Sequence, residues 1–441
     1  KIITNMALIK TNPGDSVKIT LNDNHTEAGI IMPSSKEAVT IIKLSTGYNV
    51  GFENKDIKDL KLIKKAKESS KESKQSQVPK NKNLPKISIL HTGGTIASKV
   101  DYKTGGVVAL FEVEDLLRMV PELEKIANIK ARLVSNMMSE DIRFSNYRKL
   151  THAIKKEIRE GCDGIIIGHG TDTLAITASA LSFMCENLPV PVILVGSQRS
   201  SDRGSSDAAM NLISASKFIS QTDFVGVGIC MHEHADDDSC VILPATKTRK
   251  MHTSRRDAFK AINDSPIARI SYPKGEISFL KDYNKLSERK GEVIFKEQME
   301  DKVGLLKTHP NMFVDVFEVF RKKGYKGLVL EGTGIGQAPT NTPEHQAIYE
   351  ELKNFIQEGG VVVLTSQCIY GAVHPFIYSN CRRLVEIGVI FGKDMLTETA
   401  HIKLSWLLAN EADKDQVKEL MQTNLRGEIN EKIKYSEDFT N

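Results

Sequence analysis

Two stretches of the chain decide the fold: ILHTGGTIA at residues 89–97 and GIIIGHGTDTL at residues 164–174. Each begins as a short apolar run and then breaks into small residues and hydroxyls. This pattern is typical of a buried parallel strand that ends in a loop at the edge of a sheet. Because the carboxyl ends of parallel strands share one edge, we expect Thr95, Thr171 and Asp172 to meet there.

These residue types suit the hydrolysis of an amide. A threonine hydroxyl is a weak nucleophile and needs a neighbouring base. Glycines such as Gly94 and Gly170 leave room for a substrate and let backbone N–H groups face a developing oxyanion. TGGT on its own is as typical of a phosphate-cradling turn or an ordinary loop. Its combination with the strand-borne HGTDT favours an active site.

A third segment, ATKT at residues 245–248, follows the apolar run Val241–Leu243 and offers an amine, Lys247. A lysine that is buried beside other groups can accept or relay a proton. TKT on its own is usually a solvated turn, so Lys247 is a candidate only in combination with the first two segments.

The three segments resemble the signatures of the asparaginase/glutaminase family of threonine amidohydrolases, and the similarity runs over most of residues 85–441. The resemblance implies that Thr95 is the nucleophile and that Tyr102, in the segment YKTGG, lies on a mobile loop that closes over the substrate. It further implies that Thr171 is the second hydroxyl, that Asp172 grips the substrate α-amino group and that Lys247 relays protons. No metal or cofactor is implied in this chain.

Two positions depart from the family pattern. Where many members carry Ser-Gln to hold the substrate α-carboxylate, the segment SNMMSED at residues 135–141 offers Asn136 and Met137. Gln337, in the segment GIGQAP, stands where stand-alone enzymes often have asparagine, and a substrate-lining or subunit-contact loop is expected there. These changes leave the reaction type intact and leave the choice between asparagine and glutamine open.

Composition fits a globular protein. Of 441 residues, 40% are hydrophobic and 26% are charged, and no apolar run approaches the length of a membrane helix. Six cysteines are scattered without a CxxC motif, which favours buried thiols in a cytoplasmic protein over disulfides or zinc. The segment HEHADDD at residues 232–238 has ligand-type residues, but an exposed acidic loop is favoured over a metal site.

Charge is concentrated in one segment. Lys64 to Asn83 holds seven lysines and two glutamates, a balance of +5 against +4 for the whole chain. This polar segment has no hydrophobic period, so we expect a flexible basic linker at residues 64–84. Such a linker could contact RNA or an acidic partner, or serve only as a solvated tether.

The linker divides the chain. Residues 1–63 contain short strand-like runs at Ser16–Leu21, Glu27–Met32, Ala38–Leu44 and Tyr48–Phe52, which predict a small N-terminal β-barrel. Beyond the linker, strands and helices alternate, which predicts the α/β class with doubly wound parallel sheets. We place two α/β domains of asparaginase type at residues 85–290 and 291–441. Trp406, on an apolar helical stripe, is expected in the core.

Three functions remain open from the sequence. The first is a free-standing cytosolic L-asparaginase, which needs only the two α/β domains. The second follows from the added barrel and tether, which resemble the GatD family, the glutaminase components of archaeal glutamyl-tRNA(Gln) amidotransferases. That resemblance implies a homodimer that hydrolyses glutamine and passes ammonia to a GatE-like, tRNA-binding partner. ATP and Mg are then expected at the partner, and Glu-tRNA(Gln) is contacted mainly through it. The third is a non-catalytic scaffold, against which the intact Thr95, Thr171, Asp172 and Lys247 argue.

Overall fold

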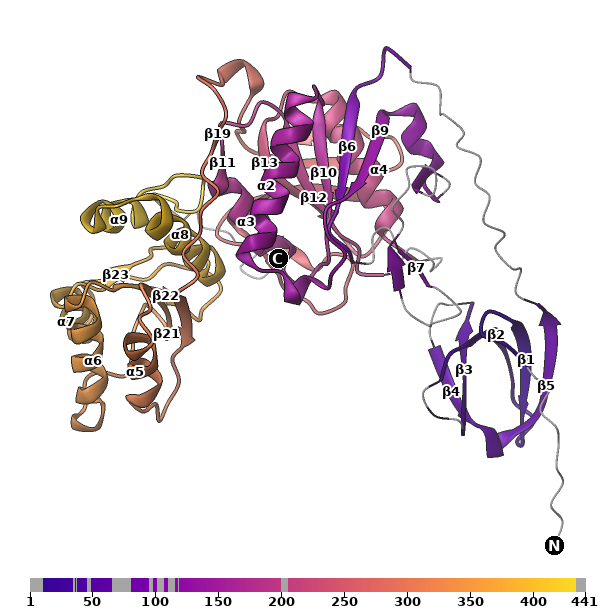
Figure 1. Ribbon diagram of the computed structural model, residues 1–441, viewed down its shortest axis with the longest axis horizontal. Helices are drawn as coiled ribbons and strands as arrows, with labels where there is room; N and C mark the ends of the chain where they lie inside the picture. The colour runs from indigo at the N-terminus through magenta and orange to yellow at the C-terminus, as the bar shows by residue number, and fades with distance from the viewer. Residues whose placement is uncertain are drawn as a thin grey trace, which may run out of the picture.

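The N-terminal unit is an antiparallel sheet. The computed structural model describes residues 11–433 except 35, 37, 46–48, 66–80, 95–97, 101–106, 110–115, 118 and 200–204. Five strands, β1 (Ser16–Leu21), β2 (Thr26–Met32), β3 (Val39–Leu44), β4 (Asn49–Glu53) and β5 (Ile57–Lys64), pair in the order β4-β3-β2-β1-β5. The sheet curls around a small apolar cluster that includes Val17, Ile19 and Ile42 (Figure 1). The predicted N-terminal β domain is therefore present, with β5 as a strand that the sequence pattern did not reveal.

The second unit contains an eight-stranded sheet in the order β18-β17-β14-β13-β12-β10-β6-β9. Five strands are parallel: β6 (Lys86–His91), β9 (Asn128–Leu133), β10 (Gly164–Gly168), β12 (Pro191–Val195) and β13 (Gly226–His232). The antiparallel strands β14 (Ser239–Pro244), β17 (Ala268–Ser271) and β18 (Ile277–Phe279) extend one edge. The expected parallel core of the sheet is thus confirmed.

Helices cover both faces of this sheet because its central strands are apolar on both sides. Ile165 and Ile167 of β10 pack into the cluster that contains α2 (Phe144–Arg159) and α3 (Leu174–Met184). Ile166, which points the other way, packs into the cluster that contains α4 (Ala208–Gln221). The period of two along a single strand therefore produces the doubly wound arrangement.

The third unit repeats the theme with four parallel strands in the order β20-β21-β22-β23: β20 (Val303–Lys307), β21 (Gly327–Gly332), β22 (Val361–Ser366) and β23 (Ile390–Phe391). One face packs against α5 (Asp315–Lys322), α6 (Gln346–Gln357) and α7 (Ser379–Glu386). The other face packs against α8 (Thr397–Asn410), which is followed by α9 (Lys414–Met421).

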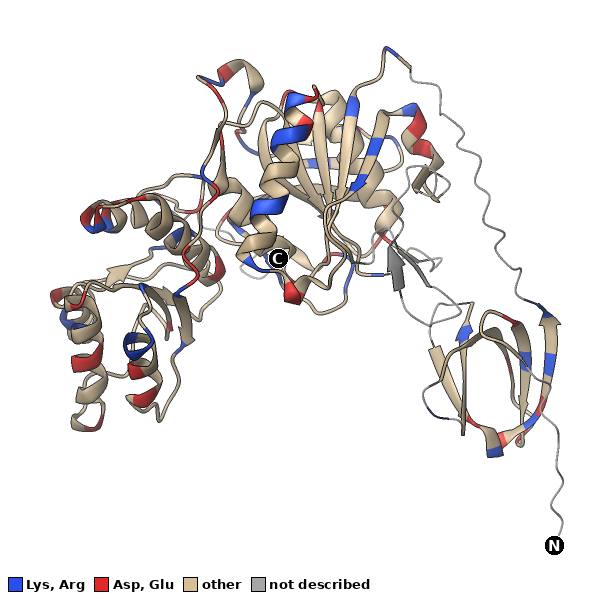
Figure 2. Cartoon of the chain, viewed as in Figure 1, with Lys and Arg blue, Asp and Glu red and all other residues tan. Residues whose placement is uncertain are grey.

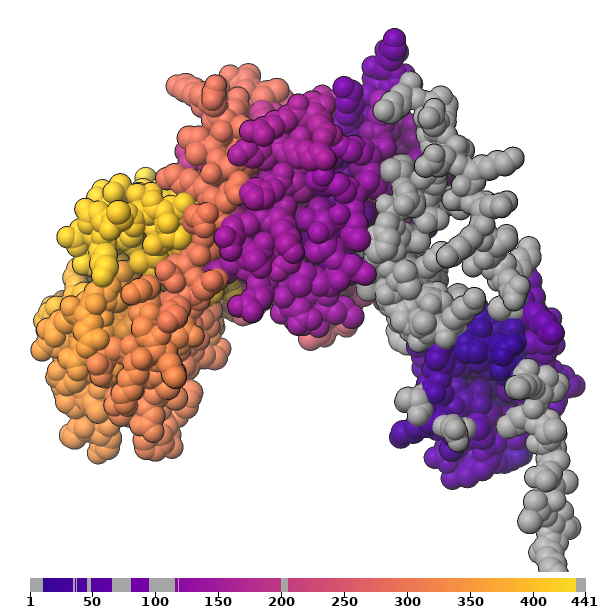
Figure 3. Space-filling view, in the orientation of Figure 1, coloured from indigo at the N-terminus to yellow at the C-terminus, as the bar shows by residue number. Residues whose placement is uncertain are grey.

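The two α/β units meet through α3 and α8, which contact each other between the two sheets (Figure 1). The predicted core position of Trp406 is confirmed, since this α8 residue is 3% exposed and its ring centroid lies 5.6 Å from that of Phe183 in α3. α3 is apolar around most of its circumference because it lies between the eight-stranded sheet and α8. Figure 3 shows the third unit, in orange and yellow, in contact with the second, in magenta.

Candidate functional site

The two signature segments form neighbouring loops at one edge of the eight-stranded sheet. β6 pairs with β10 in parallel register, with His91 opposite Gly168, so the segments that follow them begin side by side. The chain passes from β6 to β9 on one side, whereas β10 is followed by β12 on the other. The gap between β6 and β10 is therefore the point at which the winding direction reverses, where open α/β sheets bind ligands.

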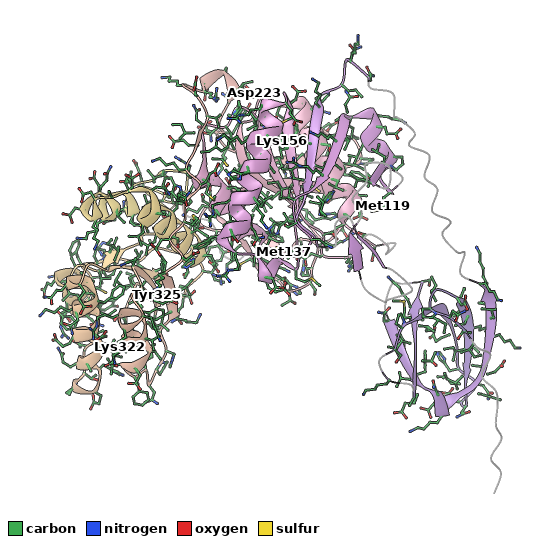
Figure 4. The ribbon with its side chains drawn as sticks, viewed as in Figure 1. Met119, Met137, Lys156, Asp223, Lys322 and Tyr325 are labelled. Atoms are coloured by element: carbon green, nitrogen blue, oxygen red, sulfur yellow. The ribbon has the colours of Figure 1, made fainter. Side chains whose placement is uncertain are left out.

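Glycines allow these loops to approach each other closely. Gly93 has a φ of +109°, and a Cβ there would lie 2.4 Å from the backbone oxygen of Met137. A Cβ on Gly94, with a φ of +85°, would lie 2.7 Å from the Cα of Gly170. The loop after β6 therefore contacts the loop after β10 backbone to backbone. Figure 4 labels Met137, which lies at this end of the sheet.

A lysine completes the constellation, and it is Lys250. Its Nζ donates to the Oγ1 of Thr171 over 2.9 Å and to the Oδ1 of Asp172 over 2.7 Å. Lys250 ends the short strand β15 (Thr248–Lys250), which pairs with β16 (Phe259–Ala261). Its side chain is 15% exposed, whereas that of Asp172 is 65% exposed and open to a ligand. The structure thus joins a hydroxyl, a carboxylate and an amine.

Lys247, which the sequence predicts beside Thr171, instead contacts Asp394 of the third unit. The Nζ of Lys247, fully buried, donates to the Oδ2 of Asp394 over 2.5 Å and to its backbone oxygen over 2.9 Å. Burial lowers the pKa of Lys247, while the Asp394 carboxylate opposes that shift. Both lysines follow β14, and only the path of the chain decides that the first faces the third unit and the second faces Thr171.

The residue beside Gly170 is Ser139 rather than Asn136. Ser139 is 5% exposed, and a Cβ on Gly170 would lie 2.8 Å from the Ser139 Cβ and 3.0 Å from its Oγ. Its backbone oxygen accepts a hydrogen bond from the Oγ1 of Thr173 over 2.7 Å. Asn136 lies on the irregular segment between β9 and Ser139, where it is exposed. The signal available in the sequence was a serine directly before two carboxylates, at the start of the 3₁₀ turn Ser139–Asp141.

His169 links the loop after β10 to α3 through hydrogen bonds. Its Nδ1 lies 2.7 Å from the backbone oxygen of Gly170, and its Nε2 lies 2.8 Å from the Oγ1 of Thr177 in α3. Complete burial lowers the pKa of His169 to about 4, so the ring is neutral at pH 7. A neutral, doubly hydrogen-bonded imidazole fixes the backbone of the HGTDT segment without adding charge to the site.

The remaining predicted site residues are not among these contacts. Thr95 and Tyr102 lie outside the described residues. Gln337 lies in the turn after β21, where its backbone N–H and oxygen pair with Thr333. That turn belongs to the four-stranded sheet, whereas Thr171 follows a strand of the eight-stranded one.

The acidic segment after β13 is held together by ion pairs. Glu233 accepts from Arg269, and Asp237 accepts from Arg256 over 2.6 Å. His232 is buried against the Oδ1 of Asn211 at 2.7 Å. Over the part of the chain that the structure describes, no group of three or more His, Cys, Asp or Glu residues is arranged to hold a metal ion. Within the same residues, no helix is long and apolar enough to cross a membrane.

Charge elsewhere on the molecule is mixed. Basic and acidic residues are interspersed on α5, α6 and α9 and on the N-terminal sheet, whereas α2 carries mainly basic residues (Figure 2). Over the residues that the structure describes, the surface charge therefore marks no second site, and the candidate site is the place where Lys250 contacts Thr171 and Asp172. Such a site can bind an ammonium group through the open carboxylate and can transfer protons between an amine and a hydroxyl.

Family models match the three units in turn. Residues 11–63 match the GatD N-terminal domain, residues 86–284 match the model described as asparaginase, N-terminal, and residues 302–421 match the glutaminase/asparaginase C-terminal domain. Together these matches cover most of the chain.

Similar proteins of known name fall into two groups. The chain is 44% identical over 426 residues to the D-type subunit (GatD) of glutamyl-tRNA(Gln) amidotransferase from Pyrococcus furiosus, covering 96% of this chain and 93% of that one. It is 43% identical to the protein of the same name from Methanococcus maripaludis, covering 95% and 98%. Among solved structures, the L-asparaginase of Thermococcus kodakarensis matches with a TM-score of 0.70 and 32% identity, over 78% of this chain and 99% of that one.

Proposed function

Because the chain belongs to the GatD family of glutamyl-tRNA(Gln) amidotransferase subunits, within the asparaginase/glutaminase amidohydrolases, we propose that it is the glutaminase subunit of such an enzyme. It hydrolyses glutamine and supplies the ammonia that converts Glu-tRNA(Gln) to Gln-tRNA(Gln). This proposal rests on two features found in one chain. Thr171, Asp172 and Lys250 meet as an amidohydrolase site would require, and residues 11–63 match the GatD N-terminal domain.

Substrate binding follows from the open groups of the site. The α-ammonium of glutamine pairs with Asp172, whose carboxylate is exposed and already accepts from Lys250. We assign the α-carboxylate to the Ser139 hydroxyl and nearby backbone N–H groups, in preference to Asn136, which is exposed on the preceding irregular segment. Gly94 and Gly170 let the two loops that frame the site approach each other backbone to backbone.

The reaction proceeds in two steps. The Oγ of Thr95 attacks the side-chain amide carbon, backbone N–H groups stabilise the oxyanion, and the C–N bond breaks to release ammonia. Water then attacks the resulting ester and frees glutamate and the Thr95 hydroxyl. Lys250, through Thr171, takes the proton-relay role that the sequence assigned to Lys247, since its amine contacts the Thr171 hydroxyl. From the family resemblance, we assign to Tyr102 the role of closing over the substrate.

The partners follow the same proposal. The chain forms a homodimer, with the Gln337 turn as a subunit contact, and joins a GatE-like, tRNA-binding partner in the cytoplasm. That partner uses ATP and Mg to activate the glutamyl group and makes most contacts with the tRNA. The domains divide at 1–63, 64–84, 85–290 and 291–441, and the family matches at 11–63, 86–284 and 302–421 support this division.

The preferred substrate and the response to a partner separate this function from that of a free-standing L-asparaginase, the name that the structural neighbours carry. Glutamine and asparagine are offered separately to the full-length chain, alone and with the GatE-like partner and glutamyl-tRNA. We expect glutamine hydrolysis to rise at least about tenfold with the partner and tRNA, a coupling of about 1.4 kcal/mol. Thr95→Val, which removes the nucleophile with little change in shape, serves as the inactive control.

Rapid hydrolysis of asparagine by the isolated chain, without any response to the GatE-like partner or tRNA, contradicts the glutaminase assignment and supports the asparaginase. A Thr95→Val protein that keeps more than about a tenth of the normal kcat contradicts the assignment of the nucleophile.

A further inference from the structure

The segment that carries Lys250 is attached to the third unit at three successive points. Lys247 pairs with Asp394, Arg249 pairs with Glu398 over 3.3 Å, and the backbone oxygen of Thr246 accepts from the Oγ1 of Thr399 over 2.9 Å. Asp394 precedes α8, and the other two partners lie in its first turn. Residues 246–249 are therefore held by one short stretch of the C-terminal unit.

The same segment presents one set of side chains to the third unit and Lys250 to the site. Within β15, successive side chains point to opposite sides, so Arg249 and Lys250 face opposite ways. Lys247 lies in the bend just before this strand, and its contact with Asp394 places it toward the third unit, as that of Arg249 with Glu398 does. Lys250 instead faces Thr171 and Asp172. A shift of the segment relative to Asp394 would displace the Lys250 amine from the Thr171 hydroxyl.

The Lys247–Asp394 pair is built to resist such a shift. The two side chains are 0% and 1% exposed. Asp394 is itself fixed, since its Oδ1 accepts from the backbone N–H of Asn430 over 3.0 Å and its Oδ2 accepts from the Asn430 Nδ2 over 2.9 Å. The backbone oxygen of Lys247 accepts from the N–H of Ile262 over 2.7 Å, just beyond β16. Both partners are therefore locked by backbone contacts.

From this geometry we propose that Asp394, through Lys247, is a positioning residue that places the Lys250 amine on the Thr171 hydroxyl. The inference rests on the proposed amidohydrolase function. It assigns to the C-terminal unit a direct part in assembling the site of the same chain, and to Lys247 a role in holding the relay lysine. The expected consequence of losing the pair is slower turnover with substrate binding largely preserved, because Asp172 and Ser139 stay on their own loops.

The test compares two buried carboxylates of the C-terminal unit. Asp394→Asn removes the charge that faces Lys247. Glu351→Gln is the matched control, because Glu351 is 5% exposed and pairs with Arg321 between α5 and α6, away from the lysine segment. Glutamine hydrolysis is measured with the full-length chain and its GatE-like partner, at a temperature at which circular dichroism shows every variant folded.

We expect kcat of Asp394→Asn to fall at least about tenfold while KM changes less than about threefold, and kcat of Glu351→Gln to stay within about twofold of normal. Lys247→Arg, which keeps a cation facing Asp394, should recover turnover relative to Lys247→Met. A folded Asp394→Asn with normal kcat, or equal losses in Asp394→Asn and Glu351→Gln, overturns the inference.

Should Asp394→Asn fail to fold, Thr399→Val decides the matter. It removes only the hydroxyl that holds the Thr246 backbone oxygen, and we expect about a threefold loss of kcat at unchanged KM; unchanged kcat would count against the inference. Failure of the underlying function looks different, because the unsubstituted protein would then release no ammonia from glutamine under any of these conditions.

Discussion

At the scale of single residues, two lysines three positions apart have opposite surroundings. Lys247 is sealed inside the molecule against Asp394, whereas Lys250 lies at the open site beside Thr171 and Asp172. Breaking a buried ion pair typically costs several kcal/mol, whereas a pair with a mostly exposed carboxylate contributes about 0–1 kcal/mol. Loss of the Lys250 amine should therefore affect catalysis much more than the free energy of unfolding.

We predict that Lys250→Met lowers kcat for amide hydrolysis at least about a hundredfold, the scale of general acid–base catalysis, with little change in thermal stability. Lys260→Met is the control, since Lys260 lies on the paired strand β16 but donates to the backbone oxygen of Glu233. Steady-state kinetics and thermal melts of both variants check this. Equal activity of the two proteins would remove Lys250 from the relay.

At the scale of elements, the loop after β6 depends on backbone approach. The φ of Gly93 is positive and its Cα faces the Met137 backbone, which cannot move aside as a flexible side chain could. Gly161, with a φ of +77°, has nothing within 4 Å of the position of its Cβ. The two glycines thus share a backbone conformation and differ in what surrounds them.

We predict that Gly93→Ala lowers kcat/KM at least about a hundredfold, because the added methyl group pushes apart the two segments that frame the site. Gly161→Ala should keep normal kinetics and lose about 1 kcal/mol of stability from its backbone conformation alone. Kinetics and urea unfolding of the pair distinguish the two effects. Normal kinetics in Gly93→Ala would show that the close approach is not needed.

At the scale of the whole molecule, the N-terminal sheet has its own core. Among the residues that the structure describes, its apolar cluster is formed by residues between 17 and 62, and its five strands pair with one another and with no other strand. Asn81, by contrast, bonds to the second unit, where its backbone N–H and oxygen contact the side chain of Asn128. A cut between these two regions should therefore spare both cores.

We predict that a chain lacking residues 1–80 is soluble, folds and hydrolyses amide substrate with near-normal kcat, but supports transamidation with the GatE-like partner at least about tenfold less efficiently. Size-exclusion chromatography, ammonia release and tRNA charging assays measure the three properties. An aggregated fragment would show that the N-terminal sheet stabilises the α/β units, and full transamidation would show that it does not serve the complex.

Much of this architecture is local in origin and was therefore accessible from the sequence. Apolar runs such as those of β6 and β10 predict buried strands, and their glycine- and hydroxyl-rich ends place Thr171 and Asp172 at one edge of a sheet. β5 was missed because its lysines and a register shift against β1 obscure the alternation.

The sequence by itself therefore determined the fold class, the edge of the sheet that bears the site and the amidohydrolase character of the chain, since each can be read from short continuous segments such as residues 89–97 and 164–174. Only the tertiary structure decided which of Lys247 and Lys250 meets Thr171, and that Ser139 rather than Asn136 lies against Gly170. Those choices depend on Asp394, which is 147 positions from Lys247, and on loops that come together from separate strands. No local pattern encodes which of two neighbouring side chains a distant carboxylate will bind.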